Sequence, residues 1–170
     1  MSEVIEKVES AERAAGLAGK YLTFKLADEE YGLGILRVKE IIGLLPITSL
    51  PQIPSYVRGV INLREKVIPV IDLRKKFKLD TIDDTGQTCI IVVDVPDRES
   101  GSVLAGILVD AVSEVLDIRG EEIEEPPAFG AGAGAAFISG MAKTKGAVKI
   151  LLDIDMVLSS AELERITKMV

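Results

Sequence analysis

The sequence predicts a mainly β protein: two small five-stranded barrel lobes packed around a shared hydrophobic core, with short helices and a C-terminal helix. Short apolar segments rich in β-branched residues alternate with turn-rich segments over residues 20–158, as expected for strands. Aromatic residues make up 4% of the chain and tryptophan is absent, so aliphatic side chains must form the core. Closing about five strands per lobe into a small barrel would remove exposed strand edges.

The N-terminal part of the chain changes character near residue 20. Residues 1–19 are charged and alanine-rich without a long apolar face, and we expect a flexible arm there. A single domain is expected over residues 20–170. Its first element is a predicted hairpin formed by residues 21–26 and 31–35.

Residues 36–42 fit two kinds of structure. The apolar spacing from Ile35 to Leu45 suits a helical stripe, whereas the local alternation suits a strand. Because β-branched residues dominate and Gly43 and Pro46 follow closely, we favour extended structure.

Residues 59–74 form the central unit of the predicted fold. Ile61 and Leu63 lie on one face of a strand, and Asn62 and Arg64 lie on the other. A charged turn leads into a buried apolar strand at 67–71. The next residue, an aspartate, is placed to cap a single helical turn.

A weak internal repeat supports two lobes. An offset of 74 residues places Gly32 on Gly106 and Glu40 on Glu114, and an offset of 81 places Gly59 on Gly140. Such repeats bury a shared apolar face by packing together. The polar segment 80–87 is the best boundary, which predicts lobe one at about 20–80 and lobe two at about 87–158. A capping box predicts a C-terminal helix at about 159–168.

The composition argues against several classes of function. The chain has no histidine, which removes the usual general base and the commonest metal ligand, so we expect no enzyme, metal or cofactor. Its net charge of -7 disfavours nucleic acid, although Arg74, Lys75 and Lys76 form a local basic patch or a solvated helix face. No apolar run is long enough to span a membrane, and the acidic start is unlike a signal peptide, which together predict a cytoplasmic protein.

Several motifs resemble those of the CheW family of chemotaxis coupling proteins. They are Pro-x-x-Pro at 51–54, Asn-Leu-Arg at 62–64, Val-Ile-Pro-Val-Ile-Asp-Leu-Arg at 67–74 and Gly-Ile-Leu-Val-Asp at 106–110. The resemblance covers nearly all of residues 20–158. It implies a non-catalytic adaptor that joins the cytoplasmic tip of a chemoreceptor to the regulatory domain of the histidine kinase CheA. It implies no small-molecule ligand and no direct membrane contact, only recruitment to membrane-associated receptor arrays.

The resemblance also implies which residues meet each partner. The receptor helix would pack in the groove between the lobes, with aliphatic walls, a close approach at a glycine and a polar clamp. The residues matching this receptor site are Val38, Asn62, Arg64, Gly106 and Val115. Those matching the kinase-facing edge are Glu40 and Ile41.

Other interpretations of these residues stay open. Val38 and Val115 could be ordinary core, Arg64 a solvated turn residue, and Gly106 a residue that relieves a strand. The family usually has glycine after Asn-Leu-Arg, where this chain has Glu65, so the turn and the direction of Arg64 need testing. The alternative functions are a coupling protein of another chemosensory array, a detached kinase regulatory domain, an enzyme using carboxylates and a nucleic-acid-binding barrel.

Overall fold

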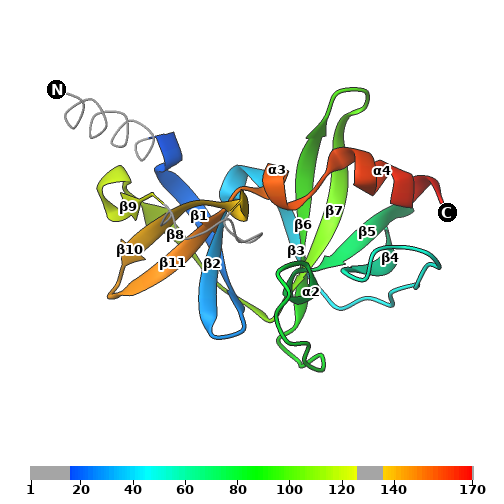
Figure 1. Ribbon diagram of the computed structural model, residues 1–170, viewed down its shortest axis with the longest axis horizontal. Coiled ribbons are helices and arrows are strands. Elements are labelled where there is room, and N and C mark those ends of the chain that lie inside the picture. Colours follow the sequence, from blue (N-terminus) through cyan, green and yellow to red (C-terminus); the bar gives the residue numbers. More distant parts are fainter. Residues whose placement is uncertain (1–15, 126–135, 170) are drawn as a thin grey trace.

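The computed structural model describes residues 16–125 and 136–169 and contains two β-sheets side by side (Figure 1). We call them sheet A and sheet B. In hydrogen-bonded order, sheet A contains β8 (Ala111–Ile118), β1 (Gly19–Leu26), β2 (Glu29–Gly34), β11 (Ala147–Leu152), β10 (Ile138–Thr144) and β9 (Ile123–Glu124). In the same sense, sheet B contains β3 (Val38–Gly43), β6 (Cys89–Asp97), β7 (Gly101–Val109), β5 (Lys66–Asp72) and β4 (Val57–Leu63).

Short helices connect and cover these strands. Between β1 and the end of the described residues, the 3-10 turns are η1 (Ile35–Arg37) and η2 (Gly120–Glu122), and the described α-helices are α2 (Leu73–Lys76), α3 (Ile154–Val157) and α4 (Ser160–Lys168). The favoured extended structure for 36–42 is therefore correct from Val38 onward, after a single helical turn. Among the described residues, no helix is long and apolar enough to cross a membrane.

The predicted mainly β, two-lobed architecture is confirmed, with a difference in detail. Sheet A has six strands rather than five, and its printed order runs from one edge strand to another. The ladder of sheet B likewise ends at β3 and β4. Within the described residues the lobes are thus curved sheets whose ladders do not close into barrels.

The predicted division into contiguous lobes at about 20–80 and 87–158 needs correction. The β1–β2 hairpin belongs to sheet A with β8 to β11, and the β6–β7 hairpin belongs to sheet B with β3 to β5. Parallel pairs, β2 with β11 and β5 with β7, insert each hairpin into its sheet. Hydrophobic pattern alone does not decide which sheet a hairpin joins, because either position would bury its apolar face. Segment 80–87 is consequently a loop that connects α2 to β6 on the side of sheet B, and it does not separate the two lobes.

The internal repeat, by contrast, is confirmed by the topology. The offset of 74 aligns β3 with β8 and β7 with β2, and the offset of 81 aligns β4 and β5 with β10 and β11. These pairs occupy the same places in the strand order of the two sheets. Each repeat therefore contributes its first hairpin to the sheet completed by the other repeat.

Among the residues that the structure describes, three apolar clusters hold the fold together. One cluster lies within sheet A around Ile118 and Leu151, and another within sheet B around Ile68 and Val92. The largest contains residues of both sheets and of α3 and α4, including Phe24. This is the shared core that the sequence predicted.

The N-terminal arm predicted at 1–19 mostly lies outside the described residues. Of its final part, Leu17 packs against the apolar cluster of sheet A, and its carbonyl accepts a hydrogen bond from the Tyr21 hydroxyl at 2.6 Å. Strand β1 already begins at Gly19. Packed structure is thus already present before residue 20, the predicted start of the domain.

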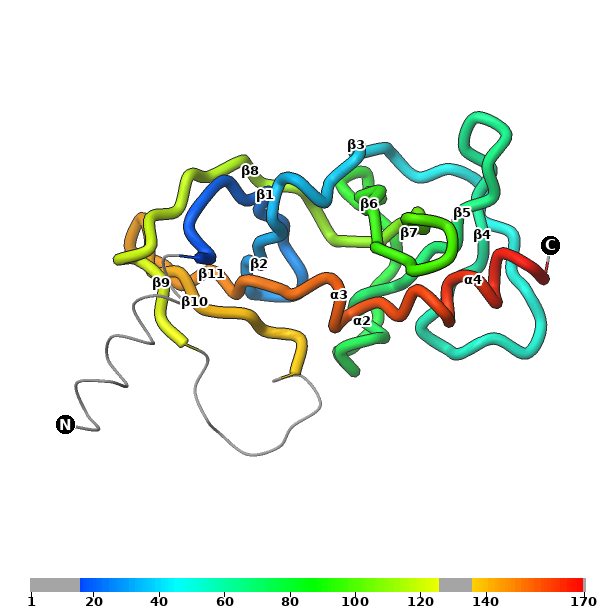
Figure 2. The backbone as a smooth tube through the Cα atoms, turned by 90° about the horizontal axis from the view of Figure 1, so that it is seen from above, coloured from blue at the N-terminus to red at the C-terminus, as the bar shows by residue number. Residues whose placement is uncertain are grey.

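The C-terminal segment carries the chain from sheet A across to sheet B (Figure 2). The Ser159 hydroxyl caps α4 by accepting a hydrogen bond from the Glu162 N–H at 3.3 Å, as the capping box predicts. Leu163 and Ile166 are buried in the shared core. The Tyr56 hydroxyl also donates to Glu162, and burial together with this carboxylate raises the pKa of Tyr56 to about 12. The predicted C-terminal helix is therefore present and docked.

Candidate protein-binding site

The turn between β4 and β5 presents the first predicted site residues. Arg64 and Glu65 have φ angles of 49° and 69°, so both central residues adopt the left-handed conformation typical of a type I′ hairpin. The Asn62 carboxamide oxygen accepts a hydrogen bond from the Glu65 N–H at 3.1 Å. Glu65 therefore adopts the conformation that glycine would favour, and Asn62 stabilises the turn that carries Arg64.

Arg64 reaches from this turn to the edge strand β3. Its two terminal nitrogens donate to the two carboxylate oxygens of Glu40 at 2.5 and 2.6 Å. Hydrogen bonding from Arg64 lowers the pKa of Glu40, and the same carboxylate raises the pKa of Arg64. The Arg64 side chain is still 71% exposed. The residues matching the receptor and kinase sites thus meet in one surface ion pair.

Two further predicted residues lie on the edge strands. Ile41 on β3 is 45% exposed and Val115 on β8 is 51% exposed. The offset of 74 makes them equivalent positions in the two sheets. Val38 is half-buried against the shared core, so it contributes to packing as well as to the surface.

Gly106 requires a correction to the predicted close approach of a partner. It is buried on β7 between Val70 of β5 and Val92 of β6. A Cβ atom at this position would lie 2.6 Å from Cγ2 of Ile90. The glycine therefore makes room for a side chain of its own sheet, which was the alternative interpretation.

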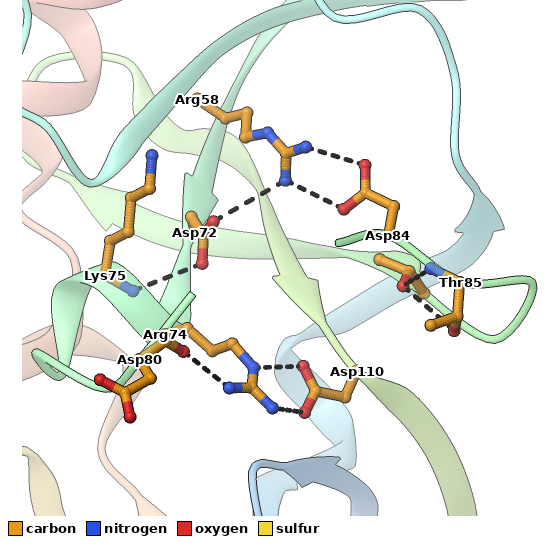
Figure 3. Close-up of polar contacts among 9 residues, drawn as sticks. Arg58, Asp72, Arg74, Lys75, Asp80, Asp84, Thr85 and Asp110 are labelled. Atoms are coloured by element: carbon orange, nitrogen blue, oxygen red, sulfur yellow. Dashed lines mark hydrogen bonds and ion pairs between the residues drawn. The ribbon is translucent and has the colours of Figure 1, made fainter. Parts of the chain in front are cut away.

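The sequence did not reveal a network of arginines and aspartates beside α2 (Figure 3). Arg58 contacts Asp84 at 2.8 and 3.3 Å and lies 3.7 Å from Asp72. Asp72 caps α2 as predicted, since its carboxylate accepts from the Lys75 N–H. The network attaches the loop that follows α2 to strand β4.

Arg74, on the same helix, forms a second group of contacts and links the sheets (Figure 3). It donates to the carboxylate of Asp110 at 2.8 and 2.6 Å and to the Asp80 carbonyl at 2.7 Å. Asp110 lies in the crossover from β7 to β8 and also accepts from the Ala27 N–H at 2.8 Å. Burial alone would raise the pKa of Asp110, but the bonds from Arg74 and Ala27 outweigh it and lower that pKa.

This pairing also removes much of the predicted basic patch. Arg74 is bound to Asp110, and the Lys76 ammonium lies 4.0 Å from the centre of the Tyr56 ring. No signal in the sequence could have paired Arg74 with a residue 36 positions away. The alternative interpretation, a solvated helix face, does not hold for Arg74 and Lys76 either, because both side chains have partners within the protein.

The other crossover carries a similar ion pair. Arg37 of η1 donates to the Asp155 carboxylate of α3 at 2.8 and 2.6 Å, and this bond raises the pKa of Arg37. The two strand-to-strand crossovers between the sheets, from β2 to β3 and from β7 to β8, are consequently both tied to a short helix.

These features define a class of protein: two sheets joined by crossovers, with ion pairs and aliphatic side chains exposed along edge strands. Within residues 16–125 and 136–169, no group of three or more His, Cys, Asp or Glu could hold a metal ion. Such surfaces suit the binding of other proteins.

Residues 20–162 match the family model of the CheW-like domain, so the chain belongs to the CheW-like family. It is 36% identical over 144 residues to the chemotaxis protein CheW of Klebsiella aerogenes, covering 85% of this chain and 84% of the relative. It is 28% identical over 127 residues to the protein FrzA of Myxococcus xanthus, covering 75% and 76%.

A solved structure agrees with this assignment. The scaffolding protein TtCheW from Thermoanaerobacter tengcongensis superposes with a TM-score of 0.74 at 37% sequence identity. The match covers 84% of this chain and 94% of that protein. The family resemblance predicted from the sequence is therefore confirmed.

Proposed function

We propose that this protein is a non-catalytic chemotaxis adaptor that couples chemoreceptors to the histidine kinase CheA. The observation that carries the proposal is the exposure of Arg64, Ile41 and Val115, which match partner-binding positions of the family and lie at the surface of the fold. The names of the relatives, chemotaxis protein and scaffolding protein, support the same role. The adaptor would work in the cytoplasm, recruited to receptor arrays at the membrane.

The kinase-facing edge in this proposal is β3, with Glu40 and Ile41. The receptor site would use Arg64, held by the turn that Asn62 stabilises, together with the aliphatic residues Val38 and Val115. Gly106 is left out of the receptor contact because it is buried.

The similarity to FrzA supports one alternative, a coupling protein of another chemosensory array. The same surfaces would then bind different receptors and a different kinase. Measuring binding to the regulatory domain of CheA from the same organism separates the two possibilities.

Isothermal titration calorimetry with that regulatory domain is the first test. We expect a one-to-one complex with a dissociation constant in the micromolar range, equivalent to about 8 kcal/mol. A folded protein that does not bind the domain would contradict the CheA assignment, while the fold and the family would stand.

Arg64→Glu tests the receptor site. It places a carboxylate against Glu40, and because both side chains are at the surface the fold should persist. We expect a severalfold loss of receptor-dependent kinase activation, measured in a reconstituted receptor, adaptor and kinase assay. Unchanged activation by a folded variant would remove Arg64 from the site.

A further inference from the structure

An open pocket of about 410 Å³ lies on sheet B beside α2, and none of the predicted site residues lines it. The loop between β3 and β4 forms one side of the pocket. The other side is formed by Arg58 of β4, Lys75 of α2 and Asp84 of the loop that follows α2. The volume is within the range of small-molecule sites in proteins.

The first side of the pocket is apolar and firmly held. Leu44, Leu45 and Ile47 line it, and the last two pack against the apolar cluster of sheet B. Thr48 fixes this loop on β4, because its N–H and its carbonyl exchange hydrogen bonds of 2.9 Å with the backbone of Val60. A hydrocarbon group placed against these side chains would be removed from water without a rearrangement of the loop.

The other side of the pocket carries two cations. Arg58 donates to both carboxylate oxygens of Asp84 at 2.8 and 3.3 Å, which is the way a guanidinium binds a carboxylate. Within the part of the chain that the structure describes, the Lys75 ammonium has no hydrogen bond or ion pair (Figure 3). The carboxylate that the protein itself supplies therefore occupies only one of the two cations.

Asp84 is held weakly at Arg58. The two side chains are 34% and 31% exposed, and ion pairs at this exposure contribute little to stability. Among the described residues, Arg58 is the one partner of the Asp84 carboxylate. A carboxylate from solution can therefore replace Asp84 at Arg58 at a small cost and contact Lys75 as well.

The balance of charge favours a ligand with a single negative charge. Asp72 lies 3.7 Å from Arg58 and stays there because it caps α2. Once Asp84 has left, Arg58 and Lys75 supply two positive charges against the one negative charge of Asp72. The remaining positive charge matches a monocarboxylate better than it matches a phosphate dianion.

We propose that this pocket binds a small organic monocarboxylate, whose carboxylate lies between Arg58 and Lys75 in place of Asp84 and whose hydrocarbon part packs on Leu44 and Ile47. This inference goes beyond the proposed function, since the family resemblance implies no small-molecule ligand. Binding releases the loop that follows α2 from strand β4.

NMR titration of the unmodified chain with hexanoate as the probe tests the inference. We expect saturable shifts of the methyl groups of Leu44, Leu45 and Ile47 and of the Asp84 amide. Acetate lacks most of the hydrocarbon and should bind at least about tenfold more weakly, and hexylammonium, with the opposite charge, should leave these signals in place. Unshifted signals at millimolar hexanoate, or equal shifts with hexylammonium, would overturn the inference.

Two pairs of variants test the role of the charges. Asp84→Asn removes the internal competitor and should tighten hexanoate binding severalfold, whereas Lys75→Gln should weaken it severalfold. Asp83→Asn and Lys78→Gln make the same changes of charge at exposed positions outside the lining and should bind hexanoate like the unmodified protein. If Asp84→Asn does not tighten binding, or if Asp83→Asn tightens it equally, the pocket is not the site. None of these results depends on whether the chain binds CheA.

Discussion

Sheets A and B contain five equivalent strands in the same order, but these strands carry different side chains at several equivalent positions. The β10–β11 turn of sheet A has Lys145 and Gly146 at φ angles of 53° and 75°, where the β4–β5 turn of sheet B has Arg64 and Glu65 at 49° and 69°. In both sheets the cation of the turn binds a glutamate on an edge strand, since Lys145 contacts Glu114 at 2.6 Å. The backbone geometry and this surface pair are therefore common to both sheets, although different residues form them.

The two strand-to-strand crossovers are also held by equivalent ion pairs, but the charges of the helix and the crossover are exchanged. In one, the short helix supplies Arg74 and the crossover supplies Asp110; in the other, the helix supplies Asp155 and the crossover supplies Arg37. The Arg74–Asp110 side chains are 13% and 20% exposed, against 34% and 46% for Arg37–Asp155. The ion pair at the β7–β8 crossover is therefore more shielded from water than the ion pair at the β2–β3 crossover.

The largest predicted difference between the sheets concerns two equivalent glycines. Gly59 has a φ of 145°, and a Cβ there would collide with the Thr48 carbonyl, whereas at Gly140 the nearest atom, Cγ2 of Ile123, is 3.1 Å away. We expect Gly59→Ala to lower the free energy of unfolding by about 3 kcal/mol or more, and Gly140→Ala by about 1 kcal/mol. Urea unfolding of both variants measures this, and equal losses would contradict the comparison.

The next difference concerns the crossovers. Arg74→Met leaves the partly buried Asp110 without its cation, and we expect a loss of about 2 kcal/mol in the free energy of unfolding. Arg37→Met breaks the more exposed pair and should cost about 0.5 kcal/mol. Chemical unfolding of the two variants under the same conditions provides the measurement. A larger loss for Arg37→Met would show that the more exposed crossover dominates.

A smaller effect is expected at the turns. Glu65→Gly removes the strain of a left-handed non-glycine residue and should stabilise the protein by about 1 kcal/mol, while Gly146→Glu should destabilise it by a similar amount. Thermal unfolding of the two variants measures both changes. If Glu65→Gly has no effect, the Asn62 hydrogen bond already offsets the strain at Glu65.

Much of the fold could be predicted from the sequence because strand patterns and caps are local. The strand periodicity, the cap at Asp72 and the repeat offsets each depend on residues that are close together or equivalent. The exchange of hairpins between the sheets could not be predicted, since the β1–β2 pattern is compatible with either sheet.

The candidate site was predicted unevenly for the same reason. The local sequence predicts a charged turn at Arg64, but it leaves the direction of Arg64 open because Glu65 stands where the family usually has glycine. It leaves the exposure of Val115 open too, because that exposure depends on which strands lie at the edges of the sheets. Whether Gly106 faces a partner or Ile90 depends on a neighbouring strand. Likewise, the Arg64–Glu40 pair requires the edges of a folded sheet.

The smallest expected effect is a pH dependence of stability at the Arg74–Asp110 crossover. The pKa of Asp110 is lowered in the folded protein, so its stabilising contribution is complete above the unfolded value of about 3.9 and is lost as the pH falls through the lower folded value. The stability difference between the unmodified protein and Asp110→Asn, measured by urea unfolding, should therefore be largest near neutral pH and narrow as the pH falls below about 4. In an Arg74→Met background the same substitution should lose most of this dependence, because Arg74 supplies two of the bonds that lower the pKa of Asp110. A dependence that persists without Arg74 would assign it to the Ala27 N–H instead.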